Sequence, residues 1–242
     1  MLPMTSFKKI NLQNILFLDI ETVPENQYFS DLAEEKQLLW EEKSAYKRKD
    51  EFTAEEYYNH AGIWAEFGKI VCISVGFFSI KEEEKQLRLK TFHGEEKQLL
   101  VEFKDLLSHH FNKPEHLLCA HNGKEFDFPY IARRMLIHNI SLPTQLNLFG
   151  KKPWEVPHLD TLEIWKFGDY KHYTSLSLLT NILGIPTPKD DIDGSQVRAV
   201  YYEENNLERI IKYCEKDVIA IAQVILKLRQ EDLLKSTEIV SV

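Results

Sequence analysis

Two carboxylates separated by one residue interrupt the first apolar segment of the chain. Asp19 and Glu21 lie within residues 14–22, which are otherwise mostly Ile, Leu and Phe, a composition typical of a buried β-strand. Side chains two residues apart on a strand point to the same face of the sheet. Two adjacent negative charges near a core are unfavourable unless something neutralises them. Either each acid pairs with a Lys or Arg, or the two together bind a divalent metal that prefers oxygen ligands, Mg²⁺ or Mn²⁺.

The overall composition is that of a globular protein with a sizeable core. The 242 residues are 43% hydrophobic and 12% aromatic. Charges interrupt every apolar run before it reaches the length of a membrane span, and residues 1–9 contain no signal-peptide core. Cys72, Cys119 and Cys214 each lie in an apolar periodic segment and are expected to be buried free thiols. We therefore expect a cytoplasmic protein with no membrane contact.

The net charge of −8 argues against a non-specific coat for nucleic acid. The charge is unevenly spread, because residues 21–58 contain eleven acids and five bases whereas residues 121–172 contain six acids and seven bases. Bound metal ions would add positive charge that the sequence count omits. A nucleic-acid enzyme with a balanced working face is therefore compatible with an acidic chain.

The periodicity of apolar residues predicts a mixed β-sheet flanked by helices, an α/β fold. The segment that follows the first strand is charged and helix-forming, and we interpret residues 25–68 as a solvated helical insertion, a lid or a spacer, within a single domain of residues 1–242. A hairpin turn is expected at 81–85. The expected strands are 14–22, 68–78, 87–92 and 117–120, and the expected helices are 95–111, 128–139, 162–167, 176–183 and 207–229.

A second candidate site follows the short strand 117–120. A strand that runs into a glycine-containing turn and then a helix delivers polar residues to the edge of the sheet, where ligand sites form. Asn122, Phe126 and Asp127 lie in this connection. The alternative is local: Asp127 caps the following helix and Asn122 with Gly123 forms a turn.

A third candidate site lies in the long final helix. Tyr213 and Asp217 are four residues apart and share a helical face with Ile210 and Ile221, so this face should point inward. A buried Asp requires a partner. The partner is either a metal ion or, in the alternative interpretation, Tyr213 or an Arg.

The order of the three motifs resembles the DEDDy group of 3′–5′ exonucleases, which have an RNase H-like fold. The motifs are Asp19-x-Glu21 followed by Thr22, then Asn122-x-x-x-Phe126-Asp127, and finally Tyr213-x-x-x-Asp217. The likeness is to the proofreading exonuclease domain of family B DNA polymerases and to its stand-alone bacterial relatives, and it covers roughly residues 14–230. A further Asp, Asp160, precedes a helix as in related enzymes. The insertion at 25–68 has no counterpart that the resemblance assigns.

The resemblance implies hydrolysis of phosphodiester bonds with two divalent metal ions, Mg²⁺ or Mn²⁺. Asp19 would bind both ions, Glu21 and Asp217 would complete the position that activates water, and Asp127 would bind the second ion through water. Tyr213 would orient the attacking water.

The resemblance also implies a binding place for the 3′-terminal nucleotides. The backbone at Thr22 would meet the 3′-hydroxyl, and Asn122 and Phe126 would contact the penultimate nucleotide, although Phe126 is equally suited to a core position. Candidate phosphate contacts are Lys124, Lys166, Lys171 and His172.

The expected function is therefore a 3′–5′ exonuclease that acts on DNA, preferably single-stranded, and releases nucleoside monophosphates, with a partner in replication or repair. Three alternatives remain open in the sequence. One is an exoribonuclease of the same fold, because discrimination of the 2′-hydroxyl depends on pocket details. The others are a non-catalytic module that binds nucleic acid or a partner, and an endonuclease of the wider RNase H-like class.

Overall fold

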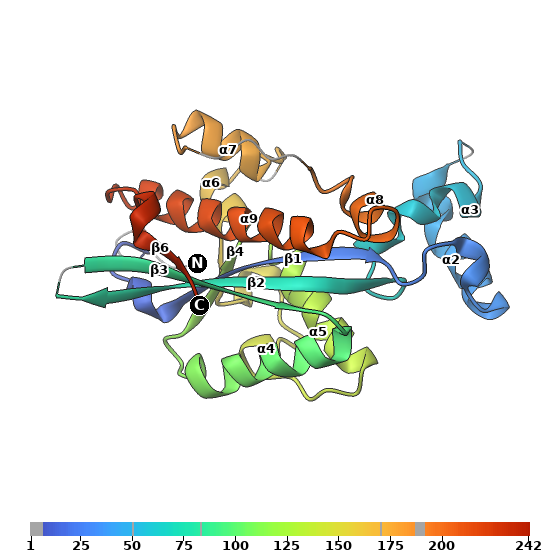
Figure 1. Cartoon of the computed structure of the whole chain (residues 1–242), viewed down its shortest axis with the longest axis horizontal. Coiled ribbons are helices and arrows are strands. Elements are labelled where there is room, and N and C mark those ends of the chain that lie inside the picture. Colours follow the sequence, from blue (N-terminus) through green and yellow to red (C-terminus); the bar gives the residue numbers. More distant parts are fainter. Residues whose placement is uncertain (1–6, 50, 83, 170, 187–191) are drawn as a thin grey trace.

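A six-stranded mixed sheet forms the centre of the computed structural model, which describes residues 7–49, 51–82, 84–169, 171–186 and 192–242. The strand order is β5-β4-β1-β2-β3-β6 (Figure 1). Strands β1, β2 and β3 pair antiparallel, whereas β4, β5 and β6 join in parallel pairings. The strand bounds are β1 (Ile15–Pro24), β2 (Gly68–Lys81), β3 (Glu84–His93), β4 (Leu117–Ala120), β5 (Leu159–Asp160) and β6 (Ile239–Ser241).

Helices cover both faces of this sheet, which confirms the predicted α/β fold. The long α9 crosses one face, and α4 and α5 lie on the other (Figure 1). The helices are α2 (Glu34–Arg48), α3 (Ala54–Tyr57), α4 (Glu96–His110), α5 (Asp127–Ile137), α6 (Thr161–Lys166), α7 (Leu176–Ile182), α8 (Val197–Tyr202) and α9 (Leu207–Leu228). Short 3₁₀ turns are η1 (Leu12–Asn14), η2 (Phe29–Asp31), η3 (Tyr58–Ile63), η4 (Thr144–Leu146), η5 (Pro153–Glu155) and η6 (Ser236–Glu238). Within the described residues, none of these helices is long and apolar enough to span a bilayer.

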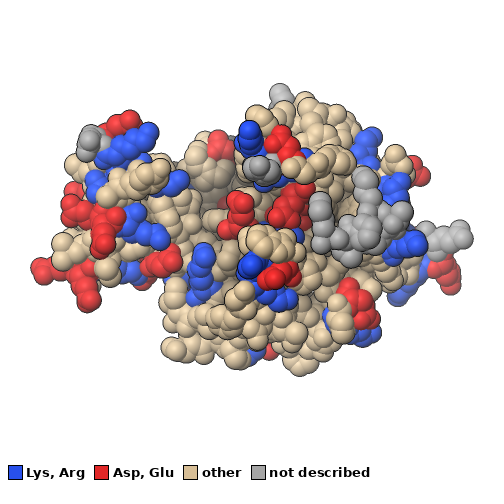
Figure 2. Space-filling view, turned by 180° about the vertical axis from the view of Figure 1, so that it is seen from behind, with Lys and Arg blue, Asp and Glu red and all other residues tan. Residues whose placement is uncertain are grey.

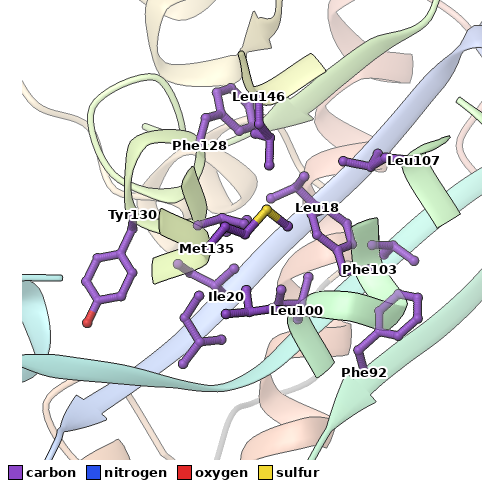
Figure 3. Close-up of a cluster of buried hydrophobic side chains, with 14 of the residues drawn as sticks. Leu18, Ile20, Phe92, Leu100, Phe103, Leu107, Phe128, Tyr130, Met135 and Leu146 are labelled. Carbon is purple, nitrogen blue, oxygen red and sulfur yellow. The ribbon is translucent and has the colours of Figure 1, made fainter. Parts of the chain in front are cut away.

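Strand β1 separates two hydrophobic cores because its side chains alternate between the faces of the sheet. Leu18 and Ile20 enter the core beneath α4 and α5, where Figure 3 shows them beside Phe103 and Met135. Phe17 points to the opposite face and packs in the cluster that α9 covers. The odd-numbered positions of β1, including 19 and 21, therefore face α9.

The insertion between β1 and β2 is helical, as expected, but it is not merely solvated. Helices α2 and α3 project beyond one end of the sheet (Figure 1). They enclose a small aromatic core around Trp40, which is fully buried and lies edge-on to Tyr58 and Phe67. Most side chains of α2 are exposed, as expected, and Trp40 is the large apolar residue of this helix that packs within the insertion itself.

A buried ion pair connects α4 and α5 beside the insertion. The guanidinium of Arg134 donates to both carboxylate oxygens of Glu96, at 2.8 and 2.5 Å, and to the carbonyl of Ala65 at 2.8 Å. Glu96 also accepts from the backbone N–H of Ile70 at 2.7 Å and lies 2.7 Å from the ring of His138. This cluster fixes the start of β2 relative to the helices of one face.

Candidate active site

Asp19 and Glu21 point to the face of the sheet that α9 covers. Their antiparallel partners on β2 are Ser74 and Cys72, and a register shift follows between Glu21 and Thr22. Asp19 keeps part of its surface exposed, whereas Glu21 is buried. The predicted geometry of the pair on one face of a strand is therefore present.

Asp127, the last residue of the second motif, lies near Asp19 and Glu21. It is the first residue of α5 and is only 3% exposed, while Phe126 takes the cap position. The alternative of Asp127 as a helix cap is not supported, because Asp127 lies inside the helix and its Oδ1 has no hydrogen-bond partner among the described residues. An unpaired buried carboxylate oxygen is unfavourable and needs a separate explanation.

Asp160 organises the loop that leads from β4 to Asp127. Its Oδ1 accepts the backbone N–H of Asn122 at 3.0 Å, and its Oδ2 accepts that of Lys124 at 3.1 Å. The same carboxylate caps α6 by accepting from Leu162 at 2.9 Å. Asn122 has a left-handed backbone (φ 61°), so this loop needs such support to keep its shape.

Helix α9 brings the third motif to the carboxylates. Asn206 caps the helix, and its inward face carries Ile210 and Cys214 in an apolar cluster. Cys214 donates from its Sγ to the backbone carbonyl of Asp19 at 3.4 Å, which places this turn of α9 directly on β1. Asp217 lies one turn further along the helix.

The electrostatics of the four acids show that they form one cluster. Burial raises the pKa of Asp19 well above its ordinary value, and the charges of Asp217, Asp127 and Glu21 raise it further, in that order. Burial also raises the pKa of Glu21, with further contributions from Cys72, Asp217 and Asp127. The pKa of Asp127 is raised to about 8, mainly by burial. Each acid thus disfavours the ionised form of its neighbours.

Two acids of the cluster, Asp19 and Asp217, line a groove with a volume of about 1150 Å³. Asp19, Asp217 and Tyr213 line it together with His121 and Tyr173, which sequence reasoning did not single out. Figure 2 shows a hollow on one side of the molecule in which acidic side chains gather, with Lys and Arg around it. The groove continues along α9, so an elongated ligand could lie there beside Asp19 and Asp217.

His121 connects two loops beside this groove. Its Nε2 lies 2.9 Å from the carbonyl of Thr174, and its Nδ1 lies 2.9 Å from Oγ1 of Thr161. Burial lowers the pKa of His121, so the neutral ring donates to Thr174 and accepts from the hydroxyl of Thr161. Tyr173, which precedes Thr174, contacts the His121 ring edge-on. The sequence signal for the linking position of His121 was its place directly after the predicted strand 117–120.

The other predicted substrate contacts differ in how accessible they are. Thr22 is partly exposed on β1, directly after the register shift. Phe126 packs against Tyr130 and the hydrophobic core, so its ring is at least partly a core residue. Lys124 pairs with Glu163 at 2.7 Å, which occupies its ammonium group.

The donor set fits a divalent metal ion. Asp217, Asp127 and Glu21 disfavour the ionised form of Asp19, and the buried Oδ1 of Asp127 has no hydrogen-bond partner within the described part of the chain. Hard oxygen ligands of this kind suit Mg²⁺ and Mn²⁺. Asp19, Glu21, Asp127 and Asp217 are the residues that would hold such ions.

The architecture has a counterpart among DNA polymerases of known structure. The family B DNA polymerase from the hyperthermophilic archaeon Pyrobaculum calidifontis superimposes with a TM-score of 0.54 and 14% identity. The alignment covers 89% of this chain and 24% of that one. At this identity the likeness concerns the fold alone, a mixed sheet flanked by helices.

A family model narrows the class to one kind of nuclease. The model described as a predicted 3′–5′ exonuclease related to the exonuclease domain of PolB matches residues 63–237. The chain therefore belongs to this family of predicted exonucleases. The match includes Asp127, Tyr213 and Asp217 but begins after β1, so it does not cover Asp19 and Glu21.

Proposed function

We propose that this protein is a metal-dependent 3′–5′ exonuclease that removes nucleotides from single-stranded DNA. One observation carries the proposal: acids from β1, α5 and α9 gather beside an open groove, and burial together with the charges of neighbouring acids raises the pKa values of Asp19, Glu21 and Asp127. Burying several carboxylates together is unfavourable unless cations bind there, so the arrangement favours a metal centre over a structural role. Membership of the exonuclease family supports the same conclusion.

Each residue has a distinct role in this proposal. When bound, two divalent cations would neutralise charge on the scissile phosphate, activate the attacking water and stabilise the leaving oxygen. Asp19 would be shared between the ions, Glu21 and Asp217 would hold the ion on the water side, and Asp127 would support the other through water. These assignments follow the positions of the residues in the three motifs.

Tyr213 is proposed to orient the attacking water. It lines the groove with Asp19 and Asp217 and stands one helical turn before Asp217. An ordinary tyrosine pKa of about 10 makes its hydroxyl a poor base at neutral pH, so it would act by hydrogen bonding. The backbone at Thr22 would contact the 3′-hydroxyl, and Asn122 and Phe126 the next nucleotide.

The domain organisation is part of the proposal. We interpret residues 1–242 as one exonuclease domain into which the helical insertion at 25–68 is built, because β1 and β2 on either side of it pair in the central sheet. The insertion has its own aromatic core and lies beyond the end of the sheet, so it is suited to contact a partner in replication or repair.

The decisive assay uses a 5′-labelled single-stranded DNA oligonucleotide with Mg²⁺, Mn²⁺ or EDTA. A ladder that shortens from the 3′ end, requires metal and disappears in Asp217→Ala would support the proposal. Asp105→Ala is the matched control, because Asp105 is exposed on α4, on the opposite face of the sheet. Internal fragments would indicate an endonuclease instead.

The same assay with an RNA oligonucleotide in competition determines the sugar preference. Preferential digestion of RNA would replace DNA with RNA as the substrate. Tight binding of single strands without turnover in any metal would refute the enzyme and leave a binding module.

A further inference from the structure

A thiol lies among the acids that are proposed to bind metal ions. The Sγ of Cys214 and one carboxylate oxygen each of Asp19 and Glu21 all lie within 4.8 Å of one another. Cys214 is fully buried on α9 and reaches β1 through its hydrogen bond to the Asp19 carbonyl. Mixed oxygen and sulfur ligands at this spacing differ from the all-oxygen set that a Mg²⁺ enzyme requires.

Sulfur changes which ions the cluster prefers. Mg²⁺ is a hard cation and takes oxygen ligands, whereas Zn²⁺ is softer and binds both thiolate and carboxylate. Zn²⁺ holds its ligands at about 2.0–2.3 Å, so ligand atoms around one tetrahedral ion lie roughly 3.5 Å apart. A contraction of about 1 Å, within reach of side-chain rotation on Asp19 and Glu21, would bring the three atoms to that spacing.

A separate observation indicates that this place can accept a ligand. Asp127 is buried, and no residue that the structure describes forms a hydrogen bond to its Oδ1. Asp127 lies close enough to Asp19 and Glu21 for its charge to act on both, so its carboxylate belongs to the same cluster. The partly exposed Asp19 lines the open groove, which gives an ion a path to the buried sulfur.

We propose that Asp19, Glu21 and Cys214 form a carboxylate–thiolate site that binds borderline-soft divalent cations such as Zn²⁺, in a mode that Mg²⁺ does not use. On binding, a metal–sulfur bond forms and the thiol proton passes to solvent. The hydrogen bond from Cys214 to the Asp19 carbonyl is lost in the same step. The proposal builds on the metal-binding part of the proposed function but concerns ion binding alone.

Cadmium alone is the probe, because Cd²⁺ replaces Zn²⁺ and a cadmium–thiolate bond absorbs in the ultraviolet, whereas cadmium bound only to oxygen or nitrogen does not. The full chain, stripped of metal with EDTA and kept reduced, is titrated with Cd²⁺ and the difference spectrum is recorded. We expect a saturating charge-transfer band at one equivalent, which Zn²⁺ abolishes at much lower concentrations than Mg²⁺. Absence of the band in the wild-type protein would overturn the proposal.

The three cysteines of the chain supply matched variants. Cys214→Ser should remove the band and weaken Cd²⁺ binding by at least about tenfold. Loss of a residue that only hydrogen-bonds to a metal ligand typically weakens metal binding by about that factor or more, and loss of a ligand should do no less. Cys119→Ser should keep it, because Cys119 is buried in the core of β4 and α9. Cys72→Ser is the stricter control, since Cys72 is the strand partner of Glu21 yet lies outside the ligand group.

The outcomes separate this proposal from the exonuclease assignment. A band that persists in Cys214→Ser, or is lost equally in Cys72→Ser, would refute the assignment to Cys214. Asp19→Asn should weaken Cd²⁺ binding while leaving Cys214 in place, so it tests the site even if Cys214→Ser folds poorly. Because the readout is an absorption band, a protein without nuclease activity would still give a positive result, and an active one could give a negative result.

Discussion

The carboxylate of Asp160 accepts a hydrogen bond from the backbone N–H of Asn122 at 3.0 Å, although the two residues lie at the ends of different strands. Asp160 ends β5 and Asn122 lies just beyond β4, so the bond joins two neighbouring strand ends. The position of Asp127, five residues after Asn122, depends on the shape of this loop. A carboxylate outside the proposed metal ligands therefore sets the geometry of one ligand.

Replacing Asp160 with Asn should loosen this loop. An amide keeps one acceptor oxygen but presents its NH₂ group to the N–H donors of Asn122 or Lys124. We expect a loss of about 1.5–3 kcal/mol in the free energy of unfolding, the range for a hydrogen bond to a charged group. Urea denaturation measures it, and Asp169→Asn, in an exposed turn, should change stability by less than about 0.5 kcal/mol.

The stability of the metal-free protein should fall as the pH rises. Folding raises the pKa of Asp127 from 3.8 to about 8, so between these values the folded state keeps a proton that the unfolded chain has released. The stabilising contribution of that proton is complete below pH 3.8 and is lost as the pH rises through about 8. Asp19 and Glu21 act in the same direction, because their pKa values are also raised.

Thermal denaturation in EDTA across this range measures the effect, and Asp127→Asn should reduce the slope. Added Mg²⁺ should stabilise the protein more at the alkaline end of this range. There the carboxylates have already lost their protons, so metal binding does not have to displace them. Stability in EDTA that rises with pH would show that these acids are not mutually repelling.

Replacing Asp19 with Asn should separate stability from activity. The substitution removes a carboxyl group whose pKa is raised by burial and by the neighbouring acids, so we expect the metal-free protein to become more stable. Metal-dependent hydrolysis should be abolished in the same variant, because a shared ligand is lost. Denaturation in EDTA beside the gel assay tests both parts, with Asp105→Asn as a neutral control.

Breaking the ion pair between Glu96 and Arg134 should be severely destabilising. Arg134→Ala leaves a buried Glu96 carboxylate without its main partner, and such losses typically cost about 3–5 kcal/mol. The neighbouring Arg133 is exposed and offers a matched control, with a change of less than about 0.5 kcal/mol for Arg133→Ala. Equal effects at both positions would contradict a structural role for the pair.

The elements that the sequence predicted well are those whose own residues specify them. Strand β1 and helix α9 have long apolar patterns of a clear period, and both were located to within a few residues. Strands β5 and β6 and helix α8 were not anticipated. The pair Leu159–Asp160 is a strand only because β4 lies beside it, and no two-residue pattern can indicate that.

The candidate site shows the same division. The strand period was enough to place Asp19 and Glu21 on one face, and the motif order was enough to connect them with Asp217. The position of Cys214 between the acids could not be predicted, because it depends on how α9 lies across β1. Likewise the sequence offered Asp127 as a helix cap, whereas the loop held by Asp160 starts the helix one residue earlier.

The insertion has a consequence for the order in which the molecule assembles. Strands β1 and β2 form the antiparallel ladder that contains Asp19, yet the whole insertion separates them in sequence. The cost of closing such a loop grows only slowly with its length, but a chain already folded between the strands shortens the search. The Glu25 N–H bonds to the Phe67 carbonyl at 2.8 Å, where the aromatic core brings the two ends together. Folding of the insertion around Trp40 would thus bring β1 and β2 together early, so that the ladder that carries Asp19 and Glu21 can pair.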